Sequence, residues 1–351
     1  SLVLKDSAVD AKQTIIDVNG EQVDKQTFLN AYNYTLTMQQ YYAQMLQQFG
    51  GDGTVDEASI LQSTLDNYIS SLVLSQKAKE LGFDQFTDAE LAELQAQAQE
   101  EYDTQLESIR TTYFADSELE GDALTAEVTA YAKANGYTLD YQLDTAKSNK
   151  ISERLKASVT NTVTITDDDL QAALDKEVAS EKETFASTPA AYGTRVNAGT
   201  AVYYTPAGYR TIRVISVDKP TEEGASSDEA KQQIDALYLR LTAGEAFETL
   251  TEDVKTYAVC ADSTTPEADV VAAAMQLTDA LSYTEVVETE KAFYLAQLVE
   301  ELPEHTATLE EARATLYDAT LTDAQDTAYN ETVQGWINAA DVKTYTERLS
   351  D

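Results

Sequence analysis

The chain has 351 residues, 43% of them hydrophobic, and a formal net charge of −38. This length suggests about two domains of roughly 150 residues each. The acidic excess repels phosphate backbones and anionic lipid headgroups, which argues against binding to nucleic acid or to a membrane surface. Its plainest interpretation is a very soluble surface, and a sharper one is long-range attraction for basic partners.

One cysteine, Cys260, and one histidine, His305, limit the chemistry further. They exclude an intrachain disulfide, a cysteine-rich zinc site and a pair of histidines on one metal. We therefore expect neither a metal nor a cofactor. No apolar run approaches the ~20 residues that a membrane span needs. Because the chain opens at Ser1 with no visible signal peptide, we interpret it as a mature or trimmed form.

The N-terminal part begins with a short apolar strand at 15–18, followed by the turn-forming pair Asn19-Gly20. Asp24 can cap a helix over 25–48, which reaches roughly 35 Å at 1.5 Å per residue. The spacing places six apolar side chains on one broad face of this helix: Phe28, Tyr32, Leu36, Tyr42, Leu46 and Phe49. Such a face requires partners from elsewhere in the chain.

Further helices are expected over 60–81, 87–113, 119–134 and 138–159, which makes the first part of the chain all-α. Two acidic stretches could be metal-binding or catalytic sites instead of plain helix ends or turns. Residues 167–169 are three aspartates, typical either of a catalytic or metal cluster or of a helix N-terminus after a capping Thr166; we adopt the helix. Residues 52–57 lack the ligand pattern of a calcium loop, so we interpret them as a turn.

From about residue 187 proline and glycine become frequent and the pattern changes. Strands are expected at 201–204, 209–217, 283–287 and 292–299, with helices over 228–241, 247–254 and 270–277, as in a small α+β domain. Helix returns after Pro303 in two short pieces, which cannot be stable alone. We expect these pieces to partner the N-terminal helices and to bury Trp336 there.

Three stretches resemble a known family. They are VNGEQVDKQTFLNAYNY at 18–34, LDNYISSLVLSQKAKELGF at 65–83, and GYRTIRVISV at 208–217, the last followed by the helical segment 228–254. In the sequence and order of these three stretches, the chain resembles the SurA/PrsA family of extracytoplasmic foldases. The resemblance implies a multidomain α and α+β fold: a discontinuous all-helical chaperone domain at 1–186 and 303–351, with a parvulin-like α+β domain inserted at 187–302.

The resemblance also identifies departures at the isomerase site. Val214 stands where parvulins carry a histidine in their first strand, and Tyr294 stands where they carry one in the last strand. Cys260 falls where the family places a Cys or Asp, although we favour a small buried hydrophobic side chain over a reactive thiol there. If these three residues form the site, catalysis is weak or absent, because Val214 offers no side-chain hydrogen bond.

Three functions remain open from the sequence. The first is an extracytoplasmic chaperone that binds unfolded or newly secreted polypeptides, with Tyr32, Tyr41 and Tyr42 lining a client-binding surface. The second is an active prolyl isomerase with altered site residues, and the third is a structural or adhesive surface protein. The resemblance implies a secreted or cell-surface location of a Gram-positive type, with membrane attachment only through a lipid anchor outside this sequence.

Overall fold

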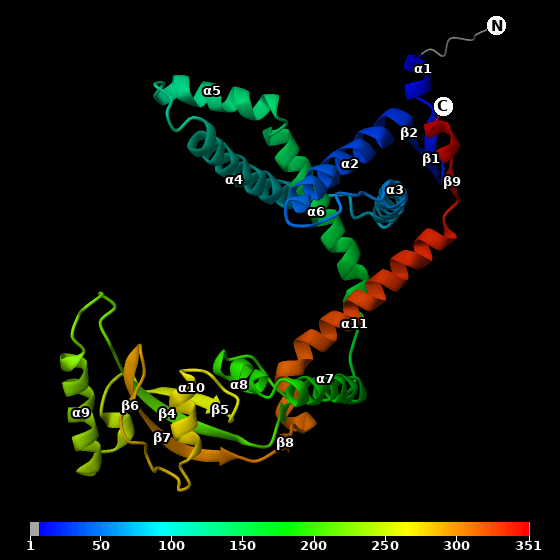
Figure 1. Cartoon of the computed structure of the whole chain (residues 1–351). Helices are drawn as coiled ribbons and strands as arrows, with labels where there is room; N and C mark the ends of the chain where they lie inside the picture. Colours follow the sequence, from blue (N-terminus) through cyan, green and yellow to red (C-terminus); the bar gives the residue numbers. More distant parts are fainter. Residues whose placement is uncertain (1–6, 351) are drawn as a thin grey trace. The chain divides into compact units, whose positions relative to one another are not determined.

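The computed structural model describes residues 7–350 and divides the chain into two compact units (Figure 1). Unit 1 comprises the chain up to Val163 together with the segment from Ala324, and unit 2 comprises Thr164–Asp323. The C-terminal segment therefore completes the N-terminal unit, as expected from the unpartnered apolar stripes. Within the described residues no helix is both long and apolar enough to cross a lipid bilayer.

Unit 1 contains an antiparallel three-stranded sheet in the order β2–β1–β9. β1 (Thr14–Val18) turns through Asn19 and Gly20, both at positive φ, into β2 (Glu21–Asp24). β9 (Val342–Thr344) then pairs with β1 from the far end of the chain. The N-terminal domain thus contains a small sheet, and its third strand, β9, was not expected from the sequence.

The helices of unit 1 begin at side-chain caps. Asp24, Asp56, Thr87 and Thr138 each accept a hydrogen bond from a first-turn amide, and Thr87 forms a full capping box with Glu90. The helical elements are α1 (Ser7–Ala11), α2 (Lys25–Gln47), α3 (Glu57–Glu80), α4 (Asp88–Tyr113), α5 (Gly121–Ala134), α6 (Leu139–Thr160), the end of α11 (Leu309–Ala339) and η2 (Thr346–Leu349).

The core of unit 1 joins both ends of the chain. Ile15, Ile16 and Phe28 are fully buried among residues of β1, α2 and α3. Trp336 and Ile337 of α11 pack against this core, and the Lys77 ammonium lies 5.5 Å from the centre of the Trp336 ring. Trp336 is half-buried rather than buried, because one side of α11 stays in solvent. In place of two short helical pieces, α11 is a single helix.

Unit 2 contains a four-stranded antiparallel sheet in the order β5–β4–β7–β6. One face packs on α9 (Asp228–Thr242) and η1 (Phe247–Thr249), and the other packs on α10 (Ala268–Met275). The strands are β4 (Tyr209–Asp218), β5 (Lys255–Val259), β6 (Val287–Glu288) and β7 (Ala292–Leu302). Alternate residues of β4 bury on opposite faces, with Val214 toward α10 and Ile215 toward α9.

The remaining elements of unit 2 are α7, α8, β3, β8 and the start of α11. α7 (Asp167–Ser187) begins at a capping box between Thr166 and Asp169, and Asp167 pairs with Arg313, so the three aspartates are a helix N-terminus as expected. α8 (Ala190–Asn197) precedes β3 (Tyr204–Thr205), which pairs with β8 (His305–Thr306).

Two expectations for unit 2 were wrong. The segment 247–254 holds only the short η1, and a strand that the sequence did not reveal, β5, follows it. α8 occupies a stretch in which no helix was expected. The compact units also divide at 163/164 and 323/324. These boundaries differ from the predicted domain ranges 1–186, 187–302 and 303–351. The predicted ranges remain a prediction.

Removing the Trp336 side chain is predicted to destabilise unit 1. Trp336→Ala should lower the unfolding free energy by about 2 kcal/mol, less than for a fully buried tryptophan because half of the side chain is already in water. The adjacent Gly335→Ala is the control: an added Cβ meets nothing within 4 Å, so this variant should be neutral or slightly stabilising. Urea melts followed by circular dichroism measure both. Equal stability of Trp336→Ala and the wild type would contradict the shared core.

Candidate functional site

The second half of α2 is unusually exposed. From Thr37 to Gly53 every residue is exposed except Ala43, which is half-buried. The first half behaves differently, since Phe28 is fully buried and Tyr32 packs against the core of unit 1. The expectation that the whole apolar face of this helix finds partners within the chain is therefore wrong beyond about Leu36. α3 and the sheet cover only the first half.

Only two of the three tyrosines proposed as a client surface lie in the exposed second half of α2. Tyr41 and Tyr42 are 68% and 57% exposed, respectively. Tyr32 is half-buried beside the core cluster that contains Phe28. Tyr41 and Tyr42 are available to a partner, whereas the contribution of Tyr32 to such a surface remains a prediction.

Sequence reasoning missed three further residues of this surface. Tyr34, Met38 and Met45 are exposed by 70%, 53% and 40%. At about 100° per residue they lie with Tyr41 and Tyr42 within an arc of roughly 100° on one side of the helix. We call these five residues the α2 face. Phe49, 84% exposed, follows directly after the helix.

A compositional signal marks the α2 face in the sequence. No Asp, Glu, Lys, Arg or His occurs from Gln26 to Gly51, although a quarter of the chain is charged. Two of the three methionines, Met38 and Met45, lie within this run. Methionine is flexible and polarisable, and it is frequent on surfaces that accept varied partners. The uncharged run could therefore have identified the surface without a structure.

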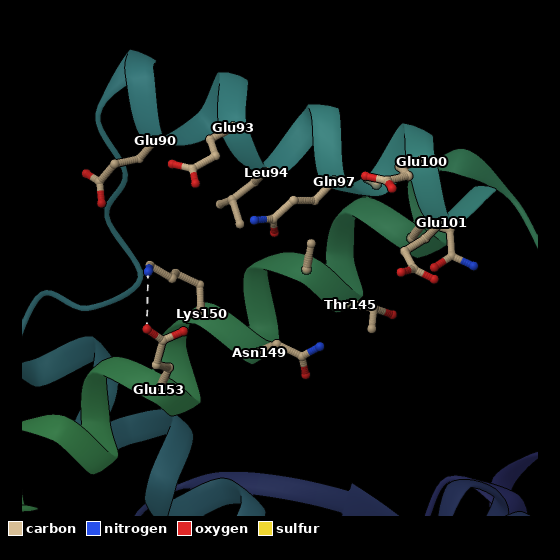
Figure 2. A pocket seen from close by; sticks show the side chains of 13 residues that line it. Glu90, Glu93, Leu94, Gln97, Glu100, Glu101, Thr145, Asn149, Lys150 and Glu153 are labelled. Carbon is tan, nitrogen blue, oxygen red and sulfur yellow. Dashed lines mark hydrogen bonds and ion pairs between the residues drawn. The ribbon is translucent and has the colours of Figure 1, made fainter. Parts of the chain in front are cut away.

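A second feature of unit 1 is an acidic groove of about 610 Å³ between α4 and α6 (Figure 2). Five glutamates line it, four from α4 and one from α6: Glu90, Glu93, Glu100, Glu101 and Glu153. Lys150, the only basic residue of the lining, lies 3.4 Å from Glu153. Glu90 is engaged by Arg154, which also donates to the carbonyl oxygens of Phe83 and Gln85.

In unit 2 the structure brings Val214 and Tyr294 into one buried cluster. They are 3% and 8% exposed and pack with Val270, Val271 and Ala274 of α10. The Tyr294 hydroxyl hydrogen-bonds Glu267, and burial together with this carboxylate raises the pKa of the phenol. α10 thus occupies the face of the sheet on which these two residues lie.

Cys260 lies elsewhere in unit 2. It follows Val259, which pairs with Arg210 of β4. Arg210 and Val214 are four residues apart on this strand, a separation of ~13 Å at 3.3 Å per residue. Cys260 is 6% exposed in a separate cluster with Tyr209 and other aromatic residues. The structure therefore does not bring Cys260 together with the other two predicted site residues.

Helix α8 packs over the strand that leads to Cys260. The Asn197 side chain accepts from the amide of Ala258 at 2.8 Å and donates to its carbonyl at 3.3 Å. The Tyr209 hydroxyl accepts from the amide of Gly193 at 3.0 Å and donates to the carbonyl of Pro189. Burial raises the pKa of the Tyr209 hydroxyl, so it stays a neutral donor. These contacts hold α8 against β5.

Comparison with known proteins gives one family match. Residues 4–118 match the SurA-like N-terminal domain. This confirms the resemblance for the segment that contains the α2 face. No curated protein matches the chain.

Solved structures similar to the chain include SurA-like chaperones of Campylobacter jejuni, at 10% identity over 95% of this chain and 98% of that chain, with a TM-score of 0.35. The chain is also similar to PrsA from Bacillus subtilis, at 16% identity over 94% of each chain with a TM-score of 0.24. A third structure is the foldase protein PrsA from Lactococcus lactis, at 17% identity over 95% and 96%, with a TM-score of 0.24.

The packing of α8 predicts the reactivity of Cys260. A thiol reagent should label the native protein more than about tenfold more slowly than the urea-unfolded chain, because a buried thiol is inert until the structure opens. In Gly193→Ala the new Cβ would lie 2.7 Å from the carbonyl oxygen of Ala258. Such a clash costs about 1–3 kcal/mol and should speed native labelling roughly tenfold.

The control for this experiment is Thr194→Ala. Thr194 is the exposed neighbour of Gly193, and its hydroxyl bonds only within α8. It should label at the wild-type rate. Equal labelling of native and unfolded wild-type protein would contradict the placement of α8 over Cys260.

Proposed function

We propose that this protein is a chaperone that binds unfolded polypeptides, with its client surface on unit 1. The observation that carries the proposal is the α2 face, an exposed and uncharged row of Tyr and Met side chains. It lies in the segment that matches the SurA-like N-terminal domain. The matched structures include chaperones and foldases by name, which supports the same class of activity here.

The chemistry of the α2 face suits clients of varied sequence. Tyrosine offers a large and rigid contact area at low cost in side-chain entropy. The methionine side chains adapt their shape to the partner. The glutamines interspersed on α2 supply hydrogen bonds without a charge. An unfolded chain can dock apolar side chains on such a surface without matching a fixed pattern.

For unit 2 we propose a parvulin-like domain without normal isomerase activity. Catalysis of prolyl isomerisation requires a pocket that holds the twisted imide and lowers a barrier of about 18–20 kcal/mol. Val214 and Tyr294 lie under α10, and Cys260 lies under α8. Burial of all three positions and the separation of Cys260 support a structural role for these residues.

We further propose that the protein acts outside the cytoplasm, as a secreted or lipid-anchored protein. The matched proteins include a periplasmic one in Campylobacter jejuni, and this likeness supports the compartment. The clients are then unfolded or newly secreted polypeptides.

Removal of the exposed tyrosines tests the client surface. Tyr41→Ser/Tyr42→Ser should raise the protein concentration that half-suppresses aggregation of a denatured test protein by roughly 30-fold. The reason is that each aromatic contact contributes about 1 kcal/mol. The matched control is Tyr137→Ser/Tyr141→Ser, which removes two exposed tyrosines from another part of unit 1. Circular dichroism verifies that both variants fold. Suppression equal to the wild type by the first variant would place the client surface elsewhere.

An isomerisation assay tests unit 2. The full chain, added to a short Xaa-Pro peptide and followed by a protease-free method, should leave the cis–trans relaxation rate at its uncatalysed value. The reason is that Val214, Tyr294 and Cys260 are all buried and cannot contact the imide of a bound peptide. Catalysis that is comparable to an ordinary parvulin and lost in Cys260→Ala would make unit 2 an active enzyme of altered chemistry.

A further inference from the structure

The charged residues that follow the α2 face in the chain are all of one sign as far as Lys77. Between Lys25 and Lys77 the chain has no basic residue, and its acidic residues there are Asp52, Asp56, Glu57 and Asp66. Asp52 accepts hydrogen bonds from the amide and hydroxyl of Thr54, which lower the pKa of its carboxyl and keep it ionised. The run that contains the α2 face thus ends in carboxylates at its C-terminal end.

A second helix of unit 1 is also strongly acidic. α4 has seven acidic residues and one basic one, Arg110. Arg110 is already paired with Glu107 at 2.5 Å. Four of the acidic side chains of α4 line the groove opposite α6 (Figure 2). The summed charge of the chain, −38, has the same sign.

An uncharged docking surface within a negative field can select unfolded segments by the charge of the residues on either side of the docked part. The apolar part of a segment can bury against Tyr and Met without desolvating a charge on the α2 face. Residues before and after that part extend into the negative potential. Basic flanks are attracted and acidic flanks are repelled, which changes the association rate more than the packing.

We propose that the α2 face docks apolar segments of unfolded polypeptides that are flanked by lysine or arginine, in preference to the same segments flanked by acidic residues. This rests on the proposed chaperone function and names the client class for it. Charge complementarity is also the reason to choose this occupant over a second copy of the chain. Two copies would approach each other with −38 each, and the carboxylates that follow α2 would face carboxylates.

Three synthetic peptides test the proposal on the full-length protein. They share one central segment of Phe, Leu and Tyr and differ only in their flanks, which are Lys, Ser or Glu. Fluorescence anisotropy at low ionic strength should give the tightest binding for the Lys-flanked peptide and the weakest for the Glu-flanked one, with about tenfold or more between them. At 0.5 M salt the difference should shrink severalfold, because screening shortens the range of exposed charges to a few Å.

Two variants that change the net charge equally locate the effect. Asp52→Asn/Glu57→Gln removes two of the carboxylates that directly follow the α2 run in the chain, while Glu222→Gln/Glu223→Gln removes two from an exposed loop of unit 2. The first variant should weaken binding of the Lys-flanked peptide by about two- to fivefold at low salt. The second should leave it unchanged. In Met38→Ser/Tyr41→Ser/Met45→Ser, all three peptides should bind at least tenfold more weakly.

The outcomes separate this inference from the function on which it rests. If the Ser-flanked peptide binds through the α2 face but the three peptides bind equally, the charge selection is wrong and the chaperone function stands. If both double variants weaken binding equally, the carboxylates beside α2 do not direct it, which also contradicts the proposal. If no peptide binds, the client surface itself is overturned together with the selection.

Discussion

The structure of unit 1 depends on the pairing of β1 with β9, which joins residues 324 to 328 positions apart, such as Val18 with Val342 and Ile16 with Thr344. The amide of Asn19 donates to the carbonyl of Asp341 at 2.8 Å, and the amide of Asp341 donates to Asn19 Oδ1 at 2.8 Å. Tyr345 donates from its amide to Ile15, and Arg348 donates to Thr14. The entropic cost of closing such a long loop grows only slowly with its length. A few hydrogen bonds beside a buried core can therefore hold the two ends of the chain together.

This closure also determines which surface is left for function. The core around Ile15, Ile16 and Phe28 is completed by β9 and by the end of α11, and it covers only the first half of α2. The side chains of the second half, apart from the half-buried Ala43, are exposed. In unit 2 both faces of the sheet are covered, so apolar surface of this kind is concentrated on α2. The contrast supports a division in which unit 1 binds clients.

The sequence revealed those features that are set by local chemistry. The caps at Asp24 and Thr166 and the turn at Asn19-Gly20 lie where the residue types predict them, because each needs only a side chain and its neighbouring amides. Features set by tertiary packing were not accessible in this way. Periodicity shows that α2 has an apolar face but not which part of it is covered. β9 is three residues long, and no local pattern distinguishes it from a loop.

The candidate sites follow the same rule. The separation of Cys260 from Val214 and Tyr294 arises from the register of β5 on β4, which the sequence does not specify.

The most direct test of the account is hydrogen exchange of the full chain with and without a saturating unfolded polypeptide. We predict slower amide exchange in α2 from Tyr34 to Gln47, and unchanged exchange in the β4 and β7 strands of unit 2. Protection confined to β4, β7 or α10, with α2 unaffected, would contradict it.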